Sequence, residues 1–155
     1  MKTLSNINAT SVSEAVLAAQ EARAEGRSYA YSGGGTDLLQ QIKDGTDAAD
    51  VIINLRNIEG SGQISASNAA ISIGGLITLE QLASNDIVAN RLSAIAQAAN
   101  SVGTPQIRNV GTLSGNVTQR PWCWYYRNGF NCFKAGGDQC YSVDGENGQH
   151  AIFGG

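Results

Sequence analysis

A short strand that runs into three glycines and then into a helix constrains the fold of this chain more than any other feature. Residues Ser28–Ser32 suit a strand, Gly33–Asp37 a tight turn and Leu38–Lys43 a helix. The apolar run Val51–Leu55 is typical of a buried strand. This order predicts a small βαβ-like unit in which the two strands are parallel.

The sequence around this unit predicts further helices and one hairpin. Ser11 and Glu14 have the spacing of a capping box, so a helix is expected from about Val12 to Glu25, with Gly26 as its left-handed end. For the helix after the glycines, Thr36 or Asp37 is the expected cap. The later chain predicts a hairpin of 63–67 with 70–74, a short helix from Thr78, a longer helix over about 90–102, and no clear period over 103–119. The expected fold class is therefore mixed α/β.

The glycine turn has the chemistry of an anion site. Backbone amides left unpaired in such a turn can bind a phosphate, and glycine lets that phosphate approach closely. The pattern is neither G-x-G-x-x-G nor a P-loop, and a plain turn that needs positive φ is an equally good interpretation. A second segment, Arg108–Asn116, carries Gly111 and Gly115 among hydroxyl and amide side chains. Two such segments together favour a long, bent ligand that carries phosphate.

All three cysteines of the chain, Cys123, Cys132 and Cys140, lie in one aromatic-rich stretch with the spacing C-x8-C-x7-C. Thiolates grouped in this way suit an iron–sulfur cluster or zinc. His150 could complete a Cys3His zinc site of structural type. Three unrelated thiols remain the third interpretation.

Composition and the remaining motifs narrow the function. A formal charge of −3 gives no electrostatic reason to expect nucleic-acid binding. No run approaches the roughly 20 apolar residues of a membrane helix, and the first residues lack the apolar stretch of a signal peptide. An odd number of cysteines argues for a reducing compartment, so we expect a cytoplasmic protein. No candidate acid, base or nucleophile stands out, so no catalytic residue is predicted.

Two segments, Tyr31–Leu38 and Val102–Asn116, resemble the two FAD-binding segments of the FAD subunit in the xanthine dehydrogenase family of molybdenum hydroxylases. Residues Gln119–Arg127, Asp144–Asn147 and 150–154 are similar to the branch of that family, including aldehyde oxidoreductase FAD subunits, that carries an extra [4Fe-4S] cluster in an inserted loop. The resemblance covers the whole chain. One departure is Ser114, where the family usually has glycine.

The resemblance implies a two-lobed, PCMH-type FAD-binding domain, with an N-terminal βαβ lobe over 1–57, an incomplete second lobe over 58–118 and an iron–sulfur loop over 119–155. It further implies an electron-transfer subunit that works with a molybdopterin-binding large subunit and a [2Fe-2S] small subunit, in the periplasm if a partner exports it. Cys123, Cys132 and Cys140 would be three of the four cluster ligands. The fourth ligand is expected beyond residue 155, in a longer subunit. This chain alone is expected to bind FAD poorly and to build no stable four-iron cluster. The implied FAD contacts are Ser32, Gly33, Gly34, Gly35, Thr36, Asp37 and Leu38 around the pyrophosphate, and Gly103, Thr104, Ile107, Gly111, Thr112, Gly115, Asn116 and Thr118 on the flavin side.

Overall fold

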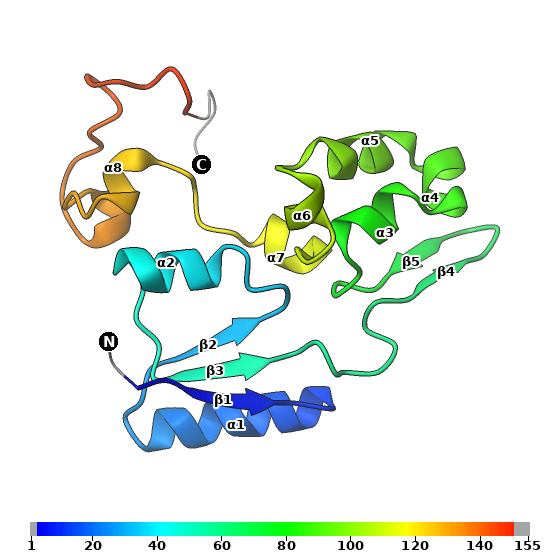
Figure 1. Ribbon diagram of the computed structural model, residues 1–155, viewed down its shortest axis with the longest axis horizontal. Coiled ribbons are helices and arrows are strands. Elements are labelled where there is room, and N and C mark those ends of the chain that lie inside the picture. Colours follow the sequence, from blue (N-terminus) through cyan, green and yellow to red (C-terminus); the bar gives the residue numbers. More distant parts are fainter. Residues whose placement is uncertain (1–2, 151–155) are drawn as a thin grey trace. The chain divides into compact units, whose positions relative to one another are not determined.

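The computed structural model describes residues 3–150, and the chain divides into two compact units (Figure 1). The first unit contains the residues up to Thr36 together with Ala49–Thr118. The second contains Asp37–Ala48 and the residues from Gln119 onward. Within residues 3–150, no helix has the length and apolar character that crossing a membrane requires.

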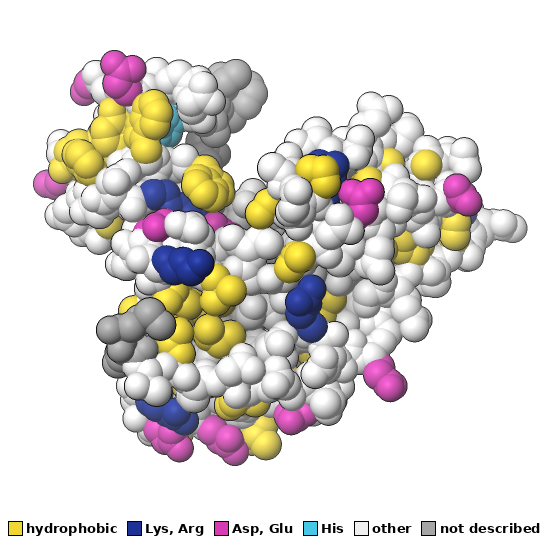
Figure 2. Space-filling view, viewed as in Figure 1, with side chains coloured by type: hydrophobic (Ala, Val, Ile, Leu, Met, Phe, Trp, Pro, Cys, Tyr) yellow, Lys and Arg dark blue, Asp and Glu magenta, His cyan; other side chains and the backbone are white. Residues whose placement is uncertain are grey.

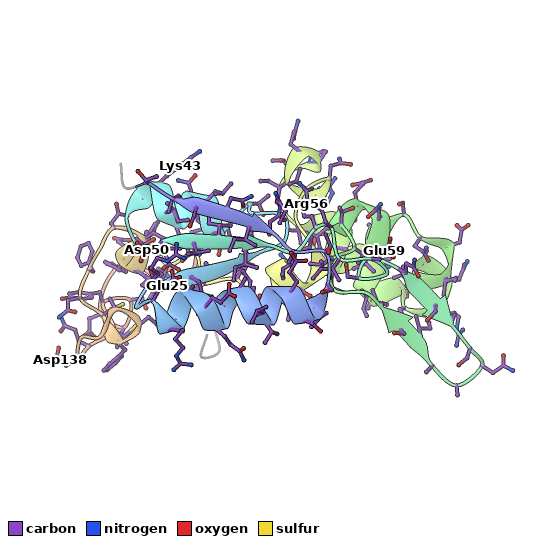
Figure 3. All side chains as sticks on the ribbon, turned by 90° about the horizontal axis from the view of Figure 1, so that it is seen from below. Glu25, Lys43, Asp50, Arg56, Glu59 and Asp138 are labelled. Carbon is purple, nitrogen blue, oxygen red and sulfur yellow. The ribbon has the colours of Figure 1, made fainter. Side chains whose placement is uncertain are left out.

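A three-stranded parallel sheet forms one part of the first unit (Figure 1). Its order is β1 (Ser5–Asn8), β3 (Val51–Asn54) and β2 (Tyr29–Ser32). The predicted parallel pairing of β2 with β3 is confirmed, with Tyr29 opposite Val51. At the start of these strands Asp50, labelled in Figure 3, accepts hydrogen bonds from the backbone N–H and the hydroxyl of Ser28, at 2.9 and 2.8 Å. The sheet therefore places the glycine turn at the carboxyl end of an edge strand.

Helix α1 (Val12–Ala24) covers one face of this sheet with small side chains. Four buried alanines of the helix pack against Val51 and Ile53, which are fully buried. Alanine brings the helix close to the strands at no cost in side-chain entropy. The predicted end at Gly26 is confirmed, since its φ is +67°.

The predicted capping box at the start of α1 is only half right. The Ser11 hydroxyl accepts a hydrogen bond from the Glu14 backbone N–H at 3.1 Å, as expected. The Glu14 carboxylate, however, accepts from the backbone N–H and the hydroxyl of Thr10, at 2.7 and 2.9 Å. Glu14 thus bonds mainly to the residue before the cap. The Thr10 N–H lowers the pKa of its carboxyl group most, then the Thr10 hydroxyl, and the Ser11 N–H expected from a capping box adds the smallest contribution.

A second hydrophobic core in the same unit joins the hairpin to three helices. The hairpin of β4 (Ile64–Ala66) and β5 (Ile71–Ile73) is antiparallel, as predicted. Helix α3 (Leu79–Ala83) starts at a true capping box, in which Thr78 and Gln81 bond to each other's backbone N–H. The core is completed by buried residues of α3, α4 (Asp86–Arg91) and α5 (Ser93–Ser101), among them Leu82, Val88, Ala96 and Ala99.

The single helix predicted over about 90–102 is wrong, because α4 and α5 are separate helices. The break is at Leu92, whose φ and ψ are −138° and 47°. Its side chain packs against the second core, and its carbonyl accepts from the Ile95 and Ala96 N–H groups to start α5. Leu92 therefore packs against the second core at the point where α4 ends and α5 begins.

Two short helices, α6 (Pro105–Arg108) and α7 (Leu113–Val117), occupy the stretch in which the sequence shows no clear period. Each begins at a threonine whose hydroxyl accepts a backbone N–H bond: Thr104 for α6 and Thr112 for α7. The second unit holds α2 (Leu38–Asp44), α8 (Trp124–Arg127) and a 3₁₀ turn over Phe133–Ala135.

Candidate functional site

The two glycine segments meet in the first unit, although they are far apart in the sequence. A Cβ atom on Gly34 would overlap the Val110 carbonyl oxygen and would lie 2.9 Å from the Gly111 Cα. A Cβ on Gly33 would lie 2.6 Å from the Thr112 hydroxyl oxygen. Such distances are too short for a side chain, so Gly34 packs backbone directly on backbone and Gly33 packs against the Thr112 side chain. The structure therefore brings the two predicted ligand segments together.

The turn carries a set of unused hydrogen-bond donors. Among residues 3–150, none accepts a hydrogen bond from the backbone N–H groups of Gly33, Gly34, Gly35 or Thr36. All four residues are half-buried, and Gly35 has a φ of +76°. Half-buried amides without partners suit an anionic group that accepts several N–H bonds at once. The donor set therefore fits a phosphate.

The second segment is held in place by backbone hydrogen bonds to residues just before and within α3. Thr112 forms an antiparallel bridge with Thr78. The Leu79 N–H donates to the Gly111 carbonyl and the Leu113 N–H to the Ile77 carbonyl, both at 3.0 Å. These bonds hold the Gly111–Leu113 backbone beside the residues at the start of α3.

The other residues predicted at the FAD site, on the pyrophosphate and the flavin sides, lie in the following places. Gly103 has a φ of +49°, and Ile107 is 38% exposed. The Gly115 N–H donates to the Thr112 hydroxyl at 3.2 Å, and the Thr118 hydroxyl donates to the Ser114 carbonyl at 2.8 Å. Ser32 ends β2, and Leu38 begins α2. Thr104 is the cap of α6, and Asn116 lies half-buried within α7.

An ion pair between Glu80 and Arg108 is a feature that sequence reasoning missed. The Arg108 Nε lies 3.2 Å from the Glu80 carboxylate, and its Nη1 donates to the Val102 carbonyl at 3.2 Å. The arginine side chain is 14% exposed and that of the glutamate 40%. This pair closes the 102–108 loop and ties it to α3. No local sequence pattern signals a pair that is 28 residues apart.

Asp37, predicted as part of the FAD turn and as a possible helix cap, makes other contacts in the second unit. It stands at the cap position of α2, but its side chain makes no capping hydrogen bond. Its carboxylate accepts instead from the Arg127 guanidinium at 2.7 Å, the Gln41 amide at 2.8 Å and the Arg120 N–H at 3.3 Å. The predicted cap position at Asp37 is therefore confirmed, but the capping hydrogen bond expected from its side chain is not formed among residues 3–150.

The three cysteines differ in their surroundings. Cys123 is half-buried at the cap of α8, Cys132 is buried, and Cys140 is exposed. The His150 Nε2 lies 3.1 Å from the Cys123 sulfur. The Ser142 hydroxyl lies 3.0 Å from the Cys140 sulfur, and this contact, aided by nearby N–H groups, lowers the pKa of the Cys140 thiol. Across residues 3–150, no three His, Cys, Asp or Glu side chains are grouped as metal ligands, so neither a cluster site nor a Cys3His site is assembled there.

Aromatic side chains pack around the cysteine segment and also cover its surface. Tyr125 contacts the rings of Phe130, Tyr141 and His150, with centroid distances of 5.2, 6.0 and 6.0 Å. Figure 2 shows hydrophobic side chains gathered where Figure 1 places α8 and the loop after it. The exposed ones include Trp122, Trp124, Phe130, Phe133 and Val143.

Comparison with known proteins identifies the family. Residues 2–128 match the model of the FAD binding domain in molybdopterin dehydrogenase. The chain belongs to this family of FAD-binding domains.

Two named relatives and one solved structure agree with this assignment. The chain is 36% identical to the nicotinate dehydrogenase FAD-subunit of Eubacterium barkeri over 85 residues, which is 55% of this chain and 29% of that protein. It is 29% identical to the aldehyde oxidoreductase FAD-binding subunit PaoB of Escherichia coli K12 over 157 residues, 99% of this chain and 48% of that protein. Carbon monoxide dehydrogenase from Hydrogenophaga pseudoflava superposes with a TM-score of 0.69 and 27% identity, over 74% of this chain and 39% of that one. The chain thus spans less than half the length of each of these relatives.

Proposed function

We propose that this chain is the FAD-binding, electron-transfer part of a molybdenum-containing hydroxylase or aldehyde oxidoreductase. The observation that carries the proposal is the contact of two glycine segments around four unpartnered amides, in a chain that belongs to a FAD-binding family. FAD, when bound, supplies the redox chemistry by accepting electrons from a donor centre and passing them to an acceptor. The protein supplies binding and orientation.

In this proposal the Ser32–Leu38 segment faces the pyrophosphate, and the Gly33–Thr36 amides donate to it. Gly34 must lack a side chain because the Val110 carbonyl occupies that space. The flavin side is assigned to the segment that the backbone bonds of α3 hold in place. Its residues are Gly103, Thr104, Ile107, Gly111, Thr112, Gly115, Asn116 and Thr118.

We further propose that the chain works beside a molybdopterin-binding subunit and a [2Fe-2S] subunit. Support comes from the names of relatives, which are FAD subunits or medium chains of dehydrogenases. The molybdenum subunit would bind the substrate, and this chain would only transfer electrons through its FAD. A cytoplasmic complex agrees with an odd number of cysteines.

Cys123, Cys132 and Cys140 are proposed as three ligands of a [4Fe-4S] cluster. The support is the similarity to the aldehyde oxidoreductase subunit over 99% of the chain, which includes the cysteine segment. Because residues 3–150 do not gather these thiols, cluster assembly requires this segment to change conformation. A Cys3His zinc site would require the same change.

Iron and sulfide analysis separates these two outcomes. A subunit that contains this chain and the expected fourth ligand is incubated anaerobically with ferrous iron and sulfide, or with zinc alone, and desalted before metal and sulfide are measured. Equal amounts of iron and sulfide, lost when Cys123, Cys132 or Cys140 is changed to serine, support the cluster. Zinc uptake that also needs His150, with no retained sulfide, contradicts it.

The FAD site is tested with amide NMR spectra of the ¹⁵N-labelled chain during titration with FAD, because this method detects weak binding. We expect shift changes at Gly33–Thr36 and at Val110–Thr112. Gly34→Ala should abolish these changes, since its methyl group meets the Val110 carbonyl. Gly62→Ala, whose added methyl group would be in ordinary contact at 3.5 Å, should retain them. The proposal is wrong if millimolar FAD leaves these amides unmoved in the unaltered chain.

A further inference from the structure

Arg127 is the centre of a network of contacts that closes residues 120–127 around Cys123. Its Nη2 donates to the Asp37 carboxylate at 2.7 Å and to the Arg120 carbonyl at 3.1 Å. Its Nε donates to the Pro121 carbonyl at 3.3 Å, and its backbone N–H donates to the Cys123 carbonyl at 2.9 Å. One guanidinium group therefore connects both ends of the loop that carries this thiol.

Asp37 is the counter-charge of this network, and both of its oxygens are in use. One oxygen accepts from Arg127, and the other accepts from the Gln41 amide and the Arg120 N–H. The arginine side chain is 7% exposed and that of the aspartate 18%. The guanidinium also lies 4.8 Å from the centre of the Trp122 ring, where a cation–π contact adds to its fixation. Replacing one member of such a buried ion pair destabilises the fold, because the other charge stays buried without its partner.

We propose that the Asp37–Arg127 pair is a positioning device for Cys123. It holds the 120–127 loop closed, so that the Cys123 thiol is fixed and partly shielded until this segment changes conformation. Asp37 and Arg127 act through the loop and do not touch the metal. The biological use of the device rests on the proposed ligand role of Cys123, but the closed loop itself is tested without metal.

The test is the rate at which each cysteine of the metal-free chain reacts with iodoacetamide at one fixed pH, measured by mass spectrometry of the peptides. Asp37→Asn and Arg127→Lys should each raise the rate at Cys123 by about tenfold, because each breaks a buried pair. The rate at Cys140, which is already exposed, should not change. Asp37→Glu, which keeps the carboxylate, should restore most of the slow rate at Cys123. Asp138→Asn is the matched control, since Asp138 is exposed in the same segment and makes no hydrogen bond or ion pair within the described residues (Figure 3).

Two results would overturn the proposal. One is a Cys123 rate that stays the same in both Asp37→Asn and Arg127→Lys. The other is a parallel increase at all three cysteines with a loss of far-ultraviolet circular dichroism, because this would show general unfolding rather than an opened loop. Iron and sulfide uptake by a subunit that also supplies the expected fourth ligand is a separate measurement. If it fails, the ligand role of Cys123 fails, while the alkylation rates still decide whether the pair holds the loop.

Discussion

At the scale of single residues, Gly34 is the position where the fold leaves no room for a side chain. A methyl group there would meet the Val110 carbonyl and the Gly111 Cα, which are backbone atoms and cannot rotate away. Gly34→Ala should therefore destabilise the chain by roughly 1–3 kcal/mol, the usual range for an overpacked site. Urea unfolding followed by circular dichroism measures this change. Gly62→Ala is the control, and an equal loss in both variants would contradict the packing argument.

Glu14 is the residue whose titration should make α1 sensitive to acid. Hydrogen bonds from Thr10 lower its pKa in the folded chain below the ordinary value of 4.5. The stabilisation is therefore present above pH 4.5 and is lost as the pH falls through the lower folded value. Hydrogen exchange at the start of α1 should become faster over this acid range. Glu14→Gln should remove this change. Glu21→Gln, a substitution later in the same helix, should keep it.

At the scale of elements, α3 holds the second ligand segment at two places. Backbone bonds hold Gly111 and Leu113, and Glu80 holds Arg108. Glu80→Gln should loosen the loop from Val102 to Arg108 and cost about 0.5–1 kcal/mol, a small value because the glutamate is partly exposed.

Hydrogen exchange across residues 102–111 measures this loosening. Glu59→Gln, an exposed position in the same unit (Figure 3), serves as the control. If protection of the loop is unchanged in Glu80→Gln, the ion pair does not hold the segment.

At the scale of the whole molecule, the two units should unfold separately. Both tryptophans of the chain, Trp122 and Trp124, lie in the second unit, so their fluorescence reports on that unit alone. Within residues 3–150, the two clusters of buried hydrophobic residues and all the strands lie in the first unit, which also holds most of the helices. We expect the fluorescence midpoint in urea to be lower than the circular dichroism midpoint by about 1 M.

Coincident midpoints from the two probes would contradict this prediction. Arg127→Lys provides a further check, because it should lower the fluorescence midpoint and leave the midpoint of the first unit in place. A variant of the first unit, Gly34→Ala, should have the opposite pattern.

The elements that could be predicted from the sequence depend on neighbouring residues. The Ser11 and Gly26 ends of α1, the β4–β5 hairpin and the glycine turn arise from hydrogen bonds and backbone angles within a few positions. A parallel β2–β3 pair follows from the helix that separates the two strands. The two glycine segments of the candidate site were found in the same way, since glycine marks both.

Only the tertiary structure decided the features that join distant residues. In strand β1 only Ile7 is partly buried, and the other three residues are exposed. This segment forms a strand because it pairs with β3. Leu92 ends a helix while it packs against the second core. Asp37 bonds to Arg127, which is 90 residues away in the sequence. Gly34 and Val110 come into contact only when the chain folds. Local hydrogen bonds and periodicity are encoded within a few residues, whereas these contacts depend on where the whole backbone brings each side chain.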